Sequence, residues 1–285
     1  MKIVTDRGAD FGPDQLAGLQ IHFAPMRLVL DGKTYSSGVD ITPENFYELM
    51  AASSGYPSTS QATAGDFAQI YRELAKEDAD ILSIHISSGL SGTLDSARAA
   101  AEMVPEAHIT YWDTKWLSCP EGWQVEMAVR AFQAGWPVEK VMERLEVLRA
   151  KTMAMFTLDT LKYLIHGGRI SHIKGLLASL LHIRPVITVD PNTGKYAQLA
   201  QERTMKRAVQ KMVELLGEIH APGSELRMQV MHGKNPEMVD LLHETLDKAF
   251  HCHWLPTISV APVLGAHTGA GVVAFAAAPV ELFEI

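Results

Sequence analysis

The sequence predicts an α/β protein with two domains, and two observations lead to this fold class. Along residues 1–150, short apolar segments alternate with segments of helical pattern, and a β-α-β-α order predicts a parallel sheet covered on both faces. Along residues 151–285, a turn at 190–194 joins two strand-like segments among helices, which predicts a mixed sheet. We therefore expect a three-layer α/β/α domain at 1–150 and a mixed-sheet α/β domain at 151–285.

In the first half, compact apolar runs predict the strands, and capping residues mark the helix starts. Thr42 precedes a proline at the first helical position, and Thr63 opens another helix. Strands are predicted at 2–5, 21–30 (turned at 31–33), 81–86 and 109–112, and helices from 42, then at 63–78, 93–103, 122–133 and 137–150.

The second half has a different texture, with more strands and fewer helices. Asp190-Pro191-Asn192-Thr193-Gly194 is a typical hairpin turn. No internal repeat or low-complexity linker marks the start of this half. Strands are predicted at 153–158, 183–189, 196–200, 225–231, 255–260 and 272–276, and helices at 204–219 and 236–250.

Composition excludes several classes of protein. Hydrophobic residues make up 47% and charged residues 20% of the 285, which is typical of a globular chain rather than a disordered one. The net charge of −8 argues against a nucleic-acid or anionic-membrane surface. Only Cys119 and Cys252 are present, and the chain begins without an apolar signal segment. No apolar stretch approaches the roughly 18 residues that span a bilayer, so we expect a cytoplasmic protein with no integral membrane segment.

Three separate segments are rich in hydroxyl groups or glycine and contain no lysine or arginine. They are predicted as loops at 58–61, 87–93 and 265–271. Glycine lets a ligand approach the backbone, and free N–H groups at a helix start attract an anion. Without a cation, such a site suits a single carboxylate better than a triphosphate. The sequence therefore predicts a carboxylate-binding pocket.

The segment at 87–93 is the strongest of the three, because it joins a predicted strand to a predicted helix. A helix cap alone needs one hydroxyl, whereas this segment has four. Ser88, Ser91 and Gly92 are therefore candidate ligand contacts. Thr59 and the pair His267 and Thr268 are weaker candidates by themselves, since such residues often only stabilise turns.

An alternative function is a serine esterase or thioesterase. Gly89-Leu90-Ser91-Gly92-Thr93 is close to the G-x-S-x-G elbow of serine hydrolases, although its last position is threonine. The chain order Ser91, then Asp113 or Asp159, then His267 also fits a triad. A third hypothesis is a sensor of phosphorylated ligands that uses the same anion site.

Metal and nucleotide cofactors are not expected. The neighbours His251-Cys252-His253 would point to opposite faces of a strand, and H-E-x-x-H, C-x-x-C and P-loop motifs are absent from the sequence. Gly167-Gly168-Arg169 either binds a phosphate or links two helices. The leucine-rich run at 173–183 either lines a lipid cavity or belongs to the core.

Together these segments resemble the DegV family, whose members bind fatty acids. The matching pieces span nearly the whole chain in the family's order. They are Ile3-Val4-Thr5-Asp6, Gly38-Val39-Asp40-Ile41, Thr59-Ser60-Gln61, the segment 87–93, Gly167-Gly168-Arg169 and His267-Thr268-Gly269.

The resemblance implies a fold, a ligand and a partner. The acyl chain would lie in the first domain, and its carboxylate would contact Thr59, Ser91 and His267 near the second. A separate fatty acid kinase would then convert the bound acid to an acyl phosphate for phospholipid synthesis. By the same analogy, Arg203 and Arg169 would engage this kinase or steady the phosphoryl group.

The leading prediction is thus a fatty-acid carrier without catalytic activity of its own. Burial of an acyl chain contributes about 0.8 kcal/mol per methylene, so a long chain binds tightly without a salt bridge. We accordingly expect a pocket of uncharged donors, with Ser88, Gly92 and Thr268 supporting the three main contacts.

Overall fold

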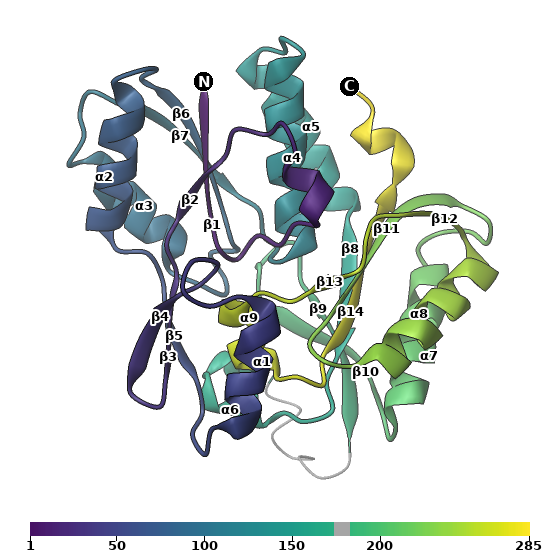
Figure 1. The fold of residues 1–285 in the computed structure, drawn as a ribbon. Coiled ribbons are helices and arrows are strands. Elements are labelled where there is room, and N and C mark those ends of the chain that lie inside the picture. Colours follow the sequence, from purple (N-terminus) through teal and green to yellow (C-terminus); the bar gives the residue numbers. More distant parts are fainter. Residues whose placement is uncertain (174–182) are drawn as a thin grey trace.

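The predicted α/β fold class is confirmed by the structure, a computed structural model that describes residues 1–173 and 183–285. A parallel sheet and a larger mixed sheet stand side by side, with α4 (Cys119–Gln133) and α5 (Val138–Lys151) between them (Figure 1). Other helices cover the outer face of each sheet. The boundary between residues 150 and 151 stays a prediction, and it falls at the end of α5.

The parallel sheet has the strand order β2-β1-β6-β7. Helices α2 and α3 pack on one face and α4 on the other, which gives the expected three layers. The predicted strand at 21–30 is wrong as one element, because Pro25 cannot donate to a ladder and the chain changes sheets there. The bounds are β1 Lys2–Asp6, β2 His22–Ala24, β6 Asp80–His85, β7 His108–Asp113, α2 Ala64–Ala75 and α3 Thr93–Ala101.

A small antiparallel sheet, β4-β3-β5, lies beside α1 (Pro43–Ala52). Asp31 and Gly32 join its first two strands, and both have positive φ (50° and 76°), as a tight hairpin turn requires. The segment predicted as a loop at 58–61 is instead mostly strand, because Thr59 pairs with Leu28. The bounds are β3 Arg27–Leu30, β4 Lys33–Ser36 and β5 Ser58–Ser60.

The mixed sheet has the order β10-β9-β8-β14-β11-β12, and β13 also pairs with β11. Its pairs are antiparallel except those of β11 with β12 and β13. The expected strand at 255–260 shrinks to β13, because Pro256 interrupts it. The bounds are β8 Met153–Thr157, β9 Arg184–Val189, β10 Tyr196–Glu202, α7 Met205–Gly217, β11 Glu225–His232, α8 Pro236–Ala249, β12 His251–Trp254, β13 Ile258–Ser259 and β14 Val273–Pro279.

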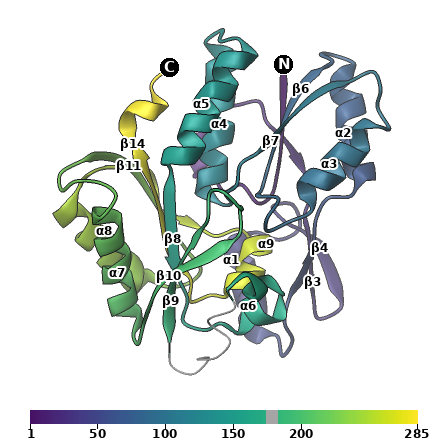
Figure 2. The ribbon, with the colours of Figure 1, turned by 180° about the vertical axis from the view of Figure 1, so that it is seen from behind.

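Two short helices near the middle of the molecule were not predicted, α6 (Lys162–His166) and α9 (Pro262–Thr268) (Figure 2). The segment at 265–271 was expected to be a loop because it has three glycines. Gly265 is helical nonetheless. Helix α9 packs so closely on α1 that a side chain at this position would meet Tyr47 Oη at 2.6 Å, which explains why the residue is glycine. Gly269, with a φ of 79°, ends the helix.

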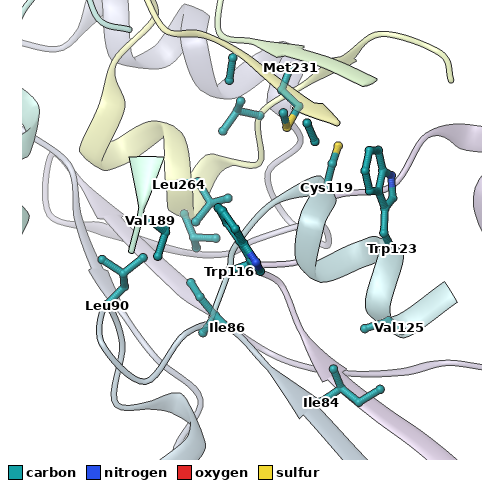
Figure 3. Close-up of a cluster of buried hydrophobic side chains, with 14 of the residues drawn as sticks. Ile84, Ile86, Leu90, Trp116, Cys119, Trp123, Val125, Val189, Met231 and Leu264 are labelled. Atoms are coloured by element: carbon teal, nitrogen blue, oxygen red, sulfur yellow. The ribbon is translucent and has the colours of Figure 1, made fainter. Parts of the chain in front are cut away.

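The two halves of the chain meet along one apolar core. Figure 3 shows Val189, Met231 and Leu264 of the second half beside Trp116 and Cys119 of the first. This contact region holds α9 and the ends of β6 and β9 close together. None of the helices in the described ranges is long and apolar enough to cross a membrane.

Candidate functional site

A polar cavity of about 290 Å³ lies where β5, the loop after β6 and α9 meet. Segments far apart in the sequence contribute its walls, as the sequence predicts. Its polar lining is Thr59, Ser60, Gln61, Ser91, Arg169 and His267, and its apolar lining is Met26, Ile86, Leu90, Leu117, Tyr196, Val263 and Leu264.

Thr59 and His267 contact each other directly inside this cavity. The Oγ1 atom of Thr59 lies 2.8 Å from Nε2 of His267, although the residues are 208 positions apart. Burial, and secondarily the charge of Arg169, lower the pKa of His267 to about 4. The imidazole is therefore neutral near pH 7. Its other ring nitrogen, Nδ1, is buried without a hydrogen-bond partner among the described residues.

Ser91 lies in the loop that connects β6 to α3, and contacts with both halves of the chain hold this loop. The Oγ atoms of Ser91 and Thr93 are 2.8 Å apart at the start of α3. Ser87 Oγ donates to the carbonyl oxygen of Gly194 (2.7 Å) in the turn between β9 and β10. A side chain at Gly89 would meet the Gly194 carbonyl carbon at 2.5 Å, so the two turns touch through their backbones. The second half thus fixes the position of Ser91.

Arg169 also lines the cavity, so the expectation of uncharged donors alone is wrong. It begins the short 3-10 helix Arg169–His172, and its Nη1 donates to the carbonyl oxygen of Gly167 (2.7 Å). The three hydroxyl- and glycine-rich segments do lack cations, but the tertiary fold brings a guanidinium from a fourth segment. The sequence signal for this guanidinium is Gly167-Gly168-Arg169, a pattern that fits either a phosphate site or a link between two helices.

Gln61 is a polar wall residue that the candidate set omitted. Its Nε2 donates to Ser96 Oγ (2.9 Å) at the start of α3. The candidate Gly92 lies beside it, and a side chain at Gly92 would meet Gln61 Nε2 at 2.8 Å. Gly92 therefore lets the amide of Gln61 approach the helix start.

Other predicted site residues lie away from the polar cavity. The N–H of Ser88 donates to Asp113 Oδ1 (3.2 Å), and its hydroxyl also donates to that carboxylate. Thr268 Oγ1 donates to the Leu264 carbonyl oxygen (3.2 Å), and Thr268 lines a neighbouring apolar cavity. Arg203 is exposed in the bend between β10 and α7.

The neighbouring apolar cavity, of about 60 Å³, shares Leu117, Tyr196 and Leu264 with the polar cavity. The two cavities are therefore neighbours that meet at these three side chains, and the apolar cavity reaches into the contact between the two halves. Of the leucine-rich run at 173–183, residues 174–182 lie outside the described part of the chain. The remaining walls are Trp116, Ser118, Pro120, Ala154, Met155, Phe156, Val189, Met231, Val260, Thr268, Val272 and Ala274.

Metal-ligating side chains do not converge in the described ranges. Across residues 1–173 and 183–285, no group of three or more histidine, cysteine, aspartate or glutamate residues could hold a metal ion. The chemistry that the site offers is hydrogen bonding and charge. Three hydroxyls, one amide, a neutral imidazole and one guanidinium line the polar cavity, and an apolar cavity lies beside it.

The chain is similar in sequence and fold to known proteins along nearly its whole length. The DegV family model, described as an uncharacterised protein family, matches residues 1–280. A DegV domain-containing protein of Staphylococcus aureus is 34% identical over 271 residues, which are 95% of this chain and 96% of the relative.

Two solved structures are similar in fold. A DegV family protein of Thermus thermophilus, described by its fatty acid binding, has a TM-score of 0.89 and 29% identity, with 98% of this chain and 99% of that chain covered. DegV of Bacillus subtilis, described as a fatty acid binding protein, has a TM-score of 0.87 and 29% identity, with 97% and 98% covered. Because the family model and the relatives both extend over almost all of the sequence, the chain belongs to the DegV family.

Proposed function

We propose that this protein binds a long-chain fatty acid, with the carboxylate in the polar cavity and the acyl chain in the neighbouring apolar cavity. The observation that carries the proposal is that the polar and apolar cavities are adjacent and share the side chains of Leu117, Tyr196 and Leu264. A site with one polar end and one apolar end suits an amphipathic ligand. The similar proteins of Thermus thermophilus and Bacillus subtilis, described as fatty acid binding, support the same ligand.

At the polar end, Thr59 and Ser91 would donate hydroxyl hydrogen bonds to the carboxylate. Arg169 would supply the opposite charge, and hydrogen bonds to ionised groups are roughly twice as strong as neutral ones. Neutral His267 would orient Thr59 through its contact with the hydroxyl. With these groups the carboxylate remains ionised.

At the apolar end, the chain would lie between the two halves. The 60 Å³ cavity is smaller than a long acyl chain, so its walls would have to move apart on binding. Met155 and Met231 are suitable for this because methionine side chains adapt to irregular space. This path is an alternative to the predicted placement of the chain within residues 1–150 alone.

The proposed role is that of a carrier without catalytic activity of its own, which presents the acid to a separate kinase in the cytoplasm. The proposal of a kinase partner rests on the family resemblance. Arg203 is exposed, as a residue that contacts a kinase would need to be. With ATP and a fatty acid kinase of a bacterial relative, acyl phosphate should form only when both proteins are present. Arg203→Ala should slow this transfer and leave fatty-acid loading unchanged. Acyl phosphate formed by this protein alone would contradict the carrier role.

The esterase alternative finds less support in the geometry. Ser91 contacts Thr93, and His267 contacts Thr59. Asp113 is bonded to Ser88 and paired with Lys115. A fluorophosphonate probe should therefore leave Ser91 unlabelled under conditions where a control esterase reacts, and labelling at Ser91 would revive the alternative.

Lipid extraction tests the proposed ligand. Protein purified from a bacterial host and denatured in organic solvent should release fatty acid that mass spectrometry detects. The double variant Thr59→Ala with Ser91→Ala should bind palmitate less tightly, by about 1.5–3 kcal/mol for each lost hydrogen bond to a charged group. The double variant Thr34→Ala with Ser54→Ala removes two exposed hydroxyls and is the matched control. Absence of both released lipid and palmitate uptake would refute the proposal.

A further inference from the structure

We propose that Gly167 is a positioning residue of the carboxylate site, which holds the ring of His267 and the guanidinium of Arg169 where both face one ligand. The inference rests on the proposed fatty-acid binding. It concerns a residue that does not line the cavity itself.

The need for glycine at this position is steric and not conformational. Gly167 has a φ of −72°, which any residue adopts. A Cβ atom there would nevertheless lie 2.0 Å from Nδ1 and 2.8 Å from Cε1 of His267. The imidazole thus rests directly on the Gly167 backbone, and a side chain as small as a methyl group would displace it.

This contact takes the place of a hydrogen bond. A functional histidine is usually oriented by a bond from its second ring nitrogen to a carbonyl or carboxylate. Here Nδ1 is buried and has no such partner among the described residues. The ring orientation that places Nε2 2.8 Å from Thr59 therefore depends on packing against Gly167.

The neighbouring backbone leaves Gly167 little freedom to yield. Its N–H donates to the Tyr163 carbonyl oxygen (2.9 Å) at the end of α6, and its carbonyl oxygen accepts from Arg169. Helix α6 in turn packs on α9, where a side chain at Gly269 would meet Tyr163 Cδ2 at 2.5 Å (Figure 2). A shift of Gly167 would consequently also move the guanidinium of Arg169.

The adjacent glycine provides a matched control. Gly168 has a φ of 76°, so alanine there strains the backbone, but nothing lies within 4 Å of its added Cβ atom. Gly168→Ala tests the effect of strain in the same turn without an atom placed against His267.

The experiment is a double-mutant cycle on palmitate affinity, measured by calorimetry for the wild type, Gly167→Ala, His267→Ala and the double variant. Gly167→Ala should weaken binding on the order of tenfold, the loss of about one hydrogen bond to a charged group. In the His267→Ala background it should have much less effect, because the ring it displaces is gone. Gly168→Ala should lower the melting temperature, and its effect on affinity should be the same in both backgrounds.

Thermal unfolding covers the case in which Gly167→Ala folds poorly. Removal of the imidazole makes room for the new methyl group, so the double variant should then melt at a higher temperature than Gly167→Ala alone. Wild-type affinity in Gly167→Ala, or an equal loss in both backgrounds, would overturn the role of Gly167. Failure of the wild type to bind palmitate would instead overturn the proposed function.

Discussion

Replacement of Arg169 by methionine removes the cation from the polar cavity while it keeps an unbranched apolar stem. In the wild type one guanidinium nitrogen already donates to Gly167, which leaves other donors for a ligand. A hydrogen bond to a charged group contributes about 1.5–3 kcal/mol, so loss of about 2 kcal/mol corresponds to a roughly thirtyfold weaker Kd for palmitate. Arg169→Lys keeps the charge but loses the planar fork, and we expect an intermediate loss.

The comparison of palmitate with hexadecanol isolates the charge. Both ligands bury the same type of chain, but the alcohol has no negative head. In calorimetric titrations Arg169→Met should weaken binding of the acid and leave binding of the alcohol nearly unchanged. An equal loss for both ligands would mean that Arg169 acts on the chain path. An unchanged affinity for the acid would refute its role as a counter-ion.

The same variant has a second readout in the protein without ligand. Arg169 is the smaller of two causes that lower the pKa of His267, and burial is the larger. Its removal should raise the pKa of His267 from about 4, yet leave it below the ordinary value of 6.5. NMR titration of the imidazole protons would measure this shift, and a pKa that stays the same would mean that the two groups do not interact.

Further predictions concern stability and chain selection. The pKa of His267 is lower in the folded protein than the ordinary 6.5 of an unfolded chain. Its contribution to the free energy of unfolding is therefore complete above pH 6.5 and is lost as the pH falls from 6.5 toward 4. His267→Gln should therefore reduce the fall in urea-unfolding free energy between pH 7 and pH 5, and an identical fall would contradict this. Ser87→Ala leaves the Gly194 carbonyl without its donor and should lower the free energy of unfolding, measured by thermal unfolding, by about 1–3 kcal/mol. A change within about 0.5 kcal/mol, which is usual for surface substitutions, would argue against the contact. Ala274→Leu fills part of the apolar cavity and should shift affinity toward shorter acids in a series from C10 to C18, while an unchanged preference would place the chain elsewhere.

Local patterns in the sequence predict most strands of the two larger sheets, but they predict neither strand β5 nor helix α9, which both border the candidate site. Strand β6 and the residue after it contain four apolar residues within 81–86, and a parallel strand buried on both faces has such a largely apolar pattern. In contrast, β5 is a run of serine and threonine that becomes a strand by pairing with β3. Helix α9 contains a glycine that only its close packing on α1 explains. Tertiary contacts outweighed local propensity in both cases.

Among the candidate site residues, some were predictable from residue type, and the position of others depends on tertiary contacts. Thr59, Ser91 and His267 were predicted from residue type and family resemblance, and the fold brings them to one cavity. The family resemblance predicts Arg169 only as a kinase contact, because no local pattern shows that the turn at Gly167 packs against His267. Ser88 has the same side chain as Ser91, but its hydroxyl donates to Asp113 at the end of the neighbouring strand. Such a competing partner is visible only once the strands are paired.

A crystal structure with a fatty acid brominated at its terminal carbon would test the central claim most directly, because the anomalous signal locates the end of the chain. We predict a bromine peak in the apolar cavity near Met155, Met231 and Ala274, with carboxylate density beside Thr59, Ser91 and Arg169. A bromine peak elsewhere, such as the surface groove between Phe23 and Ile70, or a carboxylate distant from Thr59, would contradict it.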